Sequence, residues 1–475
     1  MSDNVIKAGF KNMFYTFSSQ LIAMVLSFIS SFVLPFVLGV REFGYWQIYL
    51  FYASYLPLFY FGFNDGIYLR YGNKDYDQLP YEKLRAANKV FFIIQFIIVI
   101  LGIAMILIFE KDINKKYVYI MDILFLPVAA ATALSTSILL FTNRIKLYTL
   151  ITVIGKTLLL CGIVIFLFLK VDNYKFIVLV DQLVKIIIAA ISIYFCKEVY
   201  LGKSESLKNG TKEFIRNTKA GISLMIAMLA GTFLLGIGRL FVEKFMSIEE
   251  YGIYSFALSS TNLALVLVTS VGVIVYPTLK RLNEDKLPDY FNEINNILCI
   301  LSFLAMLMYY PIVFIIDNYI DKYVDVLKFL YILFPLIYCH SKIQILINTY
   351  YKILRKEKTM LYFNVISIII FVVITIPIFY FMKSAKIIAL TTLIASAILC
   401  YGSEIYLKMK MKILDISNIV KEMAIILFFL IINMFIKDIF IAISLYIFIY
   451  IIFIFTIRKE IVVFLRKIRN MIKYN

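Results

Sequence analysis

The sequence predicts an all-α polytopic membrane protein with about 14 transmembrane helices, forming two parallel six-helix lobes plus a C-terminal helix pair. The chain has 475 residues, of which 62% are hydrophobic and only 16% charged, a balance far from that of soluble domains. Fourteen apolar runs cross it, and several approach the roughly 20 residues that a helix needs to span the hydrocarbon core. Basic residues gather in every second gap between these runs.

The gaps themselves predict sidedness. Of the 48 basic residues, 32 lie in the two ends and the longer even-numbered gaps, and 11 lie in the short odd-numbered gaps. This positive-inside pattern predicts that both termini are cytoplasmic. The odd gaps are residues 41–43, 110–116, 170–175, 244–248, 317–323, 383–386 and 437–438, and the even gaps are residues 70–89, 143–146, 197–219, 280–293, 352–358 and 408–421.

Composition and residue pattern also argue against several classes of protein. Spans in lipid must satisfy their own backbone groups, and the runs lack the period-2 alternation of a barrel, so helices are expected. The net charge of +18 is explained by the basic side and its attraction to anionic lipid, so no nucleic-acid partner is expected. Five dispersed cysteines without ligand spacing predict neither metal nor disulfides. They are Cys161, Cys196, Cys299, Cys339 and Cys400.

A weak internal repeat with an offset of 208 residues aligns Val40–Trp46 with Ile248–Tyr254. Each copy follows the first helix of its half and opens the second. The acidic–aromatic–Gly order predicts a tight outer turn in which glycine relieves backbone strain. Six helices per half preserve orientation, so the halves are predicted to be parallel repeats.

The repeat divides the chain into four parts. Helix 13 is the weakest of the predicted spans, because its apolar run, Met423–Ile436, is short enough for a tilted or re-entrant segment. The predicted parts are a six-helix lobe at 1–196, a cytoplasmic linker at 197–219, a second six-helix lobe at 220–407, and helices 13 and 14 with a basic tail at 408–475.

The loops argue against an enzyme. No outer gap exceeds seven residues, whereas membrane polymerases and glycosyltransferases that act outside usually carry their catalytic residues on long outer loops. No metalloprotease, nucleophile-elbow, Walker A or dinucleotide motif occupies a usable loop. The sequence therefore predicts a two-lobed transporter without a cofactor.

At this point the residues resemble a known family. The chain resembles the Wzx-type O-antigen and capsule polysaccharide flippases in the turns at Glu42–Trp46 and Glu250–Tyr254, in the stretch Phe61–Gly72 and in Pro277. Their superfamily also contains the MATE drug antiporters and the lipid II flippase. The chain departs from the pattern at Gly238, because the family often has Asp directly before the basic residue that is Arg239 here.

The resemblance implies that the protein moves undecaprenyl-diphosphate-linked oligosaccharide across a bacterial cytoplasmic membrane by alternating access, for surface polysaccharide synthesis. It implies membrane lipids as partners, and it makes a polysaccharide polymerase and a chain-length regulator candidate protein partners. A MATE-type cation-coupled small-molecule antiporter is the alternative. A membrane glycosyltransferase or polymerase is disfavoured by the short outer gaps.

Five cations lie inside apolar runs and break the sidedness rule: Lys156, Lys185, Arg239, Lys328 and Lys342. A charge at the bilayer centre costs about 2.5–3.5 kcal/mol on insertion scales, so such residues usually face the bundle interior or an aqueous cavity. Snorkelling to the interface is favoured for Lys328. The other four, with His340, are the candidate cationic substrate-binding residues.

Each candidate has a structural alternative. Asp181 lies one helical turn before Lys185 and could pair with it, and Glu243 could pair with Arg239. His340 could be a hydrogen-bonded packing group or, with a pKa near 6.5, a proton-coupling group.

Further polar residues complete the candidate site. His340, Gln344 and Asn348 have i, i+4, i+8 spacing, which predicts one polar face. Asn262 joins Gln344 and Asn348 as a candidate for lining a polar cavity, with close helix packing as the alternative. Asp65 and Arg70 are predicted to form either an interface ion pair or a gate contact.

Overall fold

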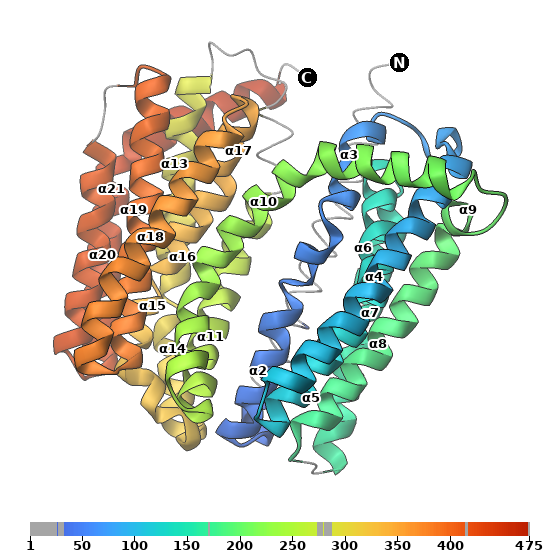
Figure 1. Ribbon diagram of the computed structural model, residues 1–475. Helices are drawn as coiled ribbons and strands as arrows, with labels where there is room; N and C mark the ends of the chain where they lie inside the picture. Colours follow the sequence, from blue (N-terminus) through green and yellow to red (C-terminus); the bar gives the residue numbers. More distant parts are fainter. Residues whose placement is uncertain are drawn as a thin grey trace. The chain divides into compact units, whose positions relative to one another are not determined.

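The computed structural model describes Leu26 and residues 33–169, 172–272, 279, 287–413 and 417–473. All regular elements in this part of the chain are helical (Figure 1), which confirms the all-α class. Within it, nine helices are long and apolar enough to cross a membrane, or ten if α5 (Ile113–Leu124) and α6 (Leu126–Phe141), bent by 43°, form one span. The total of 14 stays a prediction, since the first apolar run and Pro277 fall largely or wholly outside the described residues.

The chain divides into two compact units, Met1–Thr232 and Phe233–Asn475. The predicted linker 197–219 is largely helical and belongs to the first unit. Besides α5 and α6, the first unit contains α2 (Val40–Ala53), η1 (Leu56–Tyr60), α3 (Phe63–Tyr71), η2 (Tyr76–Gln78), α4 (Tyr81–Phe109), α7 (Ile145–Leu169), α8 (Tyr174–Phe195), α9 (Lys197–Tyr200) and most of α10 (Leu207–Phe245).

The repeated acidic–aromatic–Gly motif marks helix starts, so the predicted strained turn is wrong. Gly44 and Gly252 are buried inside the first turns of α2 and of α11 (Ile248–Gly272). The acids instead satisfy amide groups that a helix start leaves unpaired. Glu42 accepts a bond from the backbone N–H of Tyr174 at the start of α8 (3.0 Å). Glu250 forms a capping box with Ser247.

Aromatic rings and glycines join α3, α4 and α10 in the first unit. The Phe63 ring stacks on Phe91 with centroids 4.6 Å apart, and Phe214 of α10 lies 5.3 Å from Phe63. A Cβ atom at Gly66 would lie 1.8 Å from the carbonyl oxygen of Asn217. The backbones of α3 and α10 therefore touch, as small residues permit in helix interfaces.

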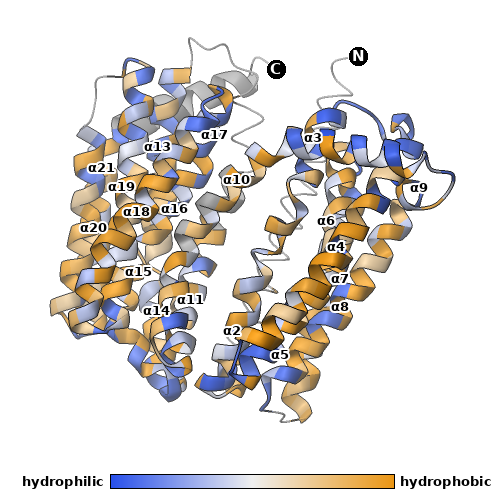
Figure 2. Ribbon diagram, viewed as in Figure 1, coloured by the Kyte–Doolittle hydropathy of each residue, from blue (hydrophilic) through white to orange (hydrophobic). Residues whose placement is uncertain are grey.

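The outer surfaces of the helices match a lipid environment. Figure 2 shows long hydrophobic faces on α4 and α7, with hydrophilic residues gathered at the helix ends. Only 17% of the most apolar window of each of these two helices is buried. Side chains this apolar and this exposed are stable against hydrocarbon rather than water, so the protein is a multi-pass membrane protein.

The second unit is built around one central, broken helical segment. Its window within Leu330–Ile353 is 94% buried. The elements are α11, α13 (Leu287–Met306), α14 (Tyr309–Tyr319), η4 (Asp321–Lys328), α15 (Leu330–Leu333), α16 (Leu336–Ser341), the π-helix η5 (Lys342–Ile347), α17 (Asn348–Ile353), α18 (Glu357–Met382), α19 (Ala385–Lys410), α20 (Ser417–Phe435) and α21 (Ile439–Lys473).

The C-terminal helix pair packs into this second unit. Helix 13 of the prediction is α20, whose 19 residues extend about 28 Å at 1.5 Å per residue, close to the thickness of the hydrocarbon core. Tyrosines anchor α21: the Tyr446 hydroxyl donates to the Phe303 carbonyl (2.8 Å) and the Tyr450 hydroxyl to the Ile300 carbonyl (3.0 Å).

Candidate functional site

A polar cluster lies among the membrane helices of the first unit; we call Tyr49, Asp122, Asp181 and Lys185 the first-unit cluster. The Lys185 Nζ atom lies 2.7 Å from Asp181 Oδ2 and donates to the Tyr49 hydroxyl at 2.6 Å. The Tyr49 hydroxyl in turn donates to Asp181. Lys185 was predicted either to pair with Asp181 or to bind substrate, and the ion pair is present. The Tyr49 hydroxyl of α2 is hydrogen-bonded to both members of this pair.

Asp122 on α5 is the unusual member of the cluster. Its side chain is 3% exposed, and neither carboxylate oxygen has a hydrogen-bond partner among the described residues. Asp181 and Lys185 are close enough to act on it electrostatically. An unpaired buried carboxylate is very costly as an anion, so Asp122 is expected to hold a proton or a cation. Sequence reasoning left Asp122 out of the site, although an acid inside an apolar run was the available signal.

Lys156 on α7 supplies a second amine next to this cluster. The structure leaves Lys156 exposed on a helix that packs against α8, and Asp181 is within electrostatic range of it. The Lys185 side chain keeps 32% of its surface exposed despite the ion pair. The first unit therefore places two predicted cations, Lys156 and Lys185, near Asp181, which forms an ion pair with Lys185.

Arg239, near the end of α10, is half-buried. Glu243 forms an ion pair with Lys244 (3.2 Å), and its predicted pair with Arg239 stays a prediction. A Cβ atom at Gly238 would lie 2.5 Å from the Tyr254 hydroxyl and 2.8 Å from Thr392 Oγ1. A larger side chain at Gly238 therefore requires the Tyr254 and Thr392 side chains to shift.

Lys342 differs most from its prediction. Its side chain is completely buried, with Nζ 2.6 Å from Glu404 Oε2 and 2.8 Å from Glu422 Oε2, and it donates to the Tyr338 hydroxyl at 2.7 Å. Lys408 approaches Glu404 from the other side at 3.0 Å. Two cations and two acids thus balance one another, and this position removes Lys342 from the cavity-lining candidates.

We call Lys342, Glu404, Lys408 and Glu422 the second-unit charge cluster. It joins three elements, η5, α19 and α20, and Asn295 of α13 adds a fourth by donating to Glu422 Oε1 at 2.6 Å. Buried charges are retained when they are paired and hydrogen-bonded. This cluster therefore fixes the register of helices that are otherwise apolar.

The three residues of the predicted polar stripe differ in exposure. His340 is buried, with Nε2 3.5 Å from Ser396 Oγ, whereas Gln344 is exposed and Asn348 is half-buried. A π-helix covers Lys342–Ile347 within this stretch, and the shared polar face stays a prediction. Asn262 on α11 is exposed and stays a candidate for lining a cavity.

Arg70 binds a different acid from the one predicted. Arg70 Nη1 donates to Glu213 and to Asn217 on α10, while Asp65 is half-buried one turn earlier on α3. Burial acts to raise the pKa of Glu213, but the bonds from Arg70 and the Tyr71 hydroxyl outweigh it, so that the pKa is lowered. Sequence distance hid this pair, since 143 residues separate its members.

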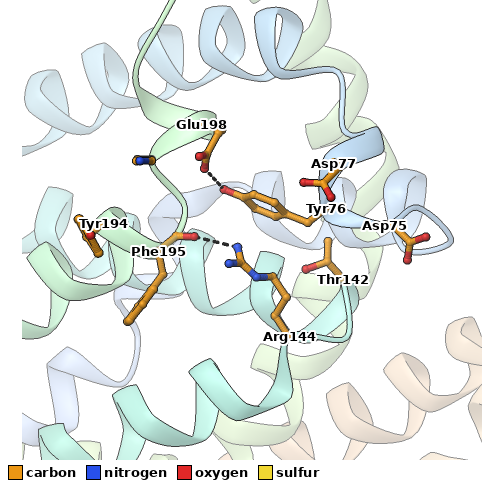
Figure 3. A pocket seen from close by; sticks show the side chains of 9 residues that line it. Asp75, Tyr76, Asp77, Thr142, Arg144, Tyr194, Phe195 and Glu198 are labelled. Carbon is orange, nitrogen blue, oxygen red and sulfur yellow. Dashed lines mark hydrogen bonds between the residues drawn. The ribbon is translucent and has the colours of Figure 1, made fainter. Parts of the chain in front are cut away.

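An open pocket of about 530 Å³ lies where the basic gaps of the first unit meet (Figure 3). The Tyr76 hydroxyl points at the Glu198 carboxylate, to which it donates at 2.7 Å, and lowers the pKa of that acid. The Arg144 guanidinium donates to the Phe195 carbonyl at 2.9 Å and lies 4.3 Å from the Tyr76 ring. Sequence reasoning missed this pocket. Its lining contains acidic and basic residues from segments far apart in sequence, such as Asp75, Arg144 and Glu198.

Comparisons with known proteins agree with this architecture. Residues 10–283 match the family model described as polysaccharide biosynthesis protein. The lipid II flippase MurJ in an inward closed conformation is similar, with 15% identity, 95% of this chain and 100% of that chain covered, and a TM-score of 0.70. An inward-facing multidrug resistance MATE family transporter of the MOP superfamily has 12% identity, 82% and 94% coverage, and a TM-score of 0.65. No curated protein matches the chain.

Proposed function

Because the chain belongs to the polysaccharide biosynthesis protein family, we propose that it moves undecaprenyl-diphosphate-linked oligosaccharide units across the bacterial cytoplasmic membrane by alternating access. The family and the fold are those of transporters and flippases rather than of enzymes. The fold likeness alone leaves the substrate open, since it extends to MATE transporters as well. The choice of substrate therefore depends on the chemistry of the side chains.

The pair of amines in the first unit supports an anionic substrate. Lys156 is exposed and Lys185 is partly exposed. Both lie on long apolar helices, where a charged side chain raises the free energy of membrane insertion and usually marks a functional site. Asp181 forms an ion pair with Lys185, whereas no ion pair of Lys156 is recorded among the described residues, which leaves this amine available to an anion. A diphosphate headgroup supplies the matching negative charge and strong acceptor oxygens.

The second unit by itself offers polar groups that suit sugar hydroxyls. Asn262 and Gln344 carry exposed amides, and an amide side chain can both donate and accept hydrogen bonds.

The decisive experiment follows the lipid-linked oligosaccharide in a strain lacking the gene. The proposal expects the complete lipid-linked oligosaccharide to accumulate on the inner leaflet, and the surface polymer to disappear. Complementation with Lys156→Gln or Lys185→Gln is expected to lower surface polymer at least severalfold, with normal amounts of protein in the membrane. Lys146→Gln and Lys175→Gln on the same two helices are the matched controls. Unchanged surface polymer in the deletion strain would overturn the proposal.

One observation favours the alternative of a cation-coupled small-molecule antiporter. Asp122 is a buried carboxylate without a hydrogen-bond partner in the described residues, and such an acid can exchange a proton or a cation during transport. In proteoliposomes this alternative expects export of a cationic dye driven by a proton or sodium gradient, and loss of export in Asp122→Asn. A gradient that drives lipid flipping but not dye export would favour the flippase.

A further inference from the structure

An apolar groove of about 490 Å³ lies at the basic end of the first unit, where residues 70–89, 143–146 and 197–219 are found. The groove runs between residues 85–96 of α4 and the two residues that end α9 and begin α10, Tyr200 and Leu207. Its lining residues are Arg85, Asn88, Lys89, Phe92, Ile93, Phe96, Tyr200 and Leu207.

The walls of the groove continue into the lipid-facing side of α4. Ile93 is 50% exposed and Phe96 is 58% exposed, and the exposed apolar face goes on to Ile97 and Ile100. The 29 residues of α4 extend about 44 Å, which exceeds the roughly 30 Å hydrocarbon core. Lys89 directly precedes the apolar run from Val90, so the groove opens at the level where lipid headgroups meet acyl chains.

The mouth of the groove carries two cations whose recorded hydrogen-bond acceptors are neutral. Arg85 donates to the backbone carbonyls of Glu198 (Nε, 2.7 Å) and Lys203 (Nη1, 2.7 Å). Lys89 Nζ donates to the Ser204 hydroxyl at 2.6 Å. Neutral acceptors hold these side chains in place without cancelling their charge. An ammonium has three donors and a guanidinium five, so both retain capacity for an anion.

The segment between Tyr200 and Leu207, the two residues that line the other wall, is held by backbone contacts. Gly202 has φ +118°, and a Cβ atom there would lie 2.7 Å from Arg85 Nη1. The backbone N–H of Glu205 donates to the Glu82 carbonyl at 3.2 Å. Glycine is therefore needed both for the conformation and for the close approach to Arg85. The groove is a built feature of the fold rather than a gap between loosely held loops.

We infer that this groove binds an anionic phospholipid, with the headgroup phosphate at Lys89 and Arg85 and one acyl chain along Phe92, Ile93 and Phe96. A soluble anion would leave the apolar wall uncovered. A zwitterionic lipid would not match a lining that contains two cations, Arg85 and Lys89, and no acid. The bound lipid would brace the segment leading into α10. This inference does not depend on which substrate the protein transports.

The test titrates the purified full-length protein with dioleoyl phosphatidylglycerol and counts bound lipid by native mass spectrometry. Dioleoyl phosphatidylcholine and inorganic phosphate are titrated in parallel. We expect saturable phosphatidylglycerol binding that Lys89→Gln weakens about fivefold, the effect of one cation near an anionic lipid surface. Phe96→Ala is expected to weaken binding as well. Lys83→Gln is the matched control, because Lys83 is exposed on α4 but does not line the groove.

Four results would overturn the assignment. Equal binding of phosphatidylcholine would show that the headgroup charge is not recognised. Equal competition by inorganic phosphate would show that the acyl chain of the lipid is not bound. An equal loss in Lys83→Gln would reduce the effect to general surface charge. Displacement by undecaprenyl phosphate at equal concentration would make the groove a substrate site instead. Circular dichroism of each variant, expected to be unchanged, separates these results from misfolding.

Discussion

Arg70 at the end of α3 forms an ion pair with Glu213 in the first part of α10, across 143 residues of sequence. The Tyr71 hydroxyl donates to the same carboxylate at 2.7 Å, and Asn217 accepts a second bond from Arg70. Glu213 is buried, so its charge has to be met by these partners. The contact holds the predicted linker against the first unit.

Arg70→Gln is therefore expected to lower the free energy of unfolding by about 1.5–3 kcal/mol, the range for a hydrogen bond to a charged group. Arg216→Gln is the control, because Arg216 lies 3.9 Å from the same carboxylate with a side chain 70% exposed, and exposed pairs contribute about 0–1 kcal/mol. Denaturation of the purified protein by sodium dodecyl sulfate measures both. Equal losses would mean that the contact does not depend on Arg70.

The same pair predicts a loss of stability in acid. The pKa of Glu213 is lowered in the folded protein, so the folded state favours the ionised form. This contribution is fully present above the unfolded pKa of about 4.3 and is lost as the pH falls through the lower, folded value. The midpoint of thermal unfolding, measured from pH 6 downward, is expected to fall less steeply in Glu213→Gln than in the wild type. Parallel curves would contradict this.

Gly66→Ala tests the backbone contact between α3 and α10. Alanine normally stabilises a helix interior relative to glycine by about 1 kcal/mol. Here the added methyl group would overlap the Asn217 carbonyl, and we expect a net loss of about 1–3 kcal/mol, as for overpacking. Gly402→Ala, whose nearest neighbour would be a Phe363 ring carbon at 3.4 Å, should be neutral or stabilising. Similar melting temperatures for the two variants would refute close packing at Gly66.

Lys342→Met tests the second-unit charge cluster. Removing the lysine leaves Glu422 and Glu404 buried with too little positive charge, and breaking such a pair costs about 3–5 kcal/mol. The double variant Lys342→Met with Glu422→Gln removes one orphaned charge and should recover part of the loss. Lys328→Met is the control, since its pair with Asp325 is largely exposed. A double variant no more stable than Lys342→Met would assign the effect to packing rather than charge.

One pair that helical spacing predicted for the candidate site is present in the structure. The i,i+4 spacing of Asp181 and Lys185 suggested their pair, and the structure contains it. Spacing failed at Lys342, whose acids come from α19 and α20. Spacing also did not reveal that His340 is buried while Gln344 is exposed, because exposure depends on the helices that pack against each residue.

The sequence by itself determined the all-helical membrane class, because the free energy of moving apolar side chains and unpaired backbone groups into lipid depends mainly on local composition. It also located five cations within the apolar runs. Only the tertiary structure decided which of these cations are neutralised, since charges in a medium of low dielectric constant interact with acids that lie far away in sequence. That is why Lys342 is paired in the core of the second unit, while Lys156 is left exposed as a candidate for substrate binding.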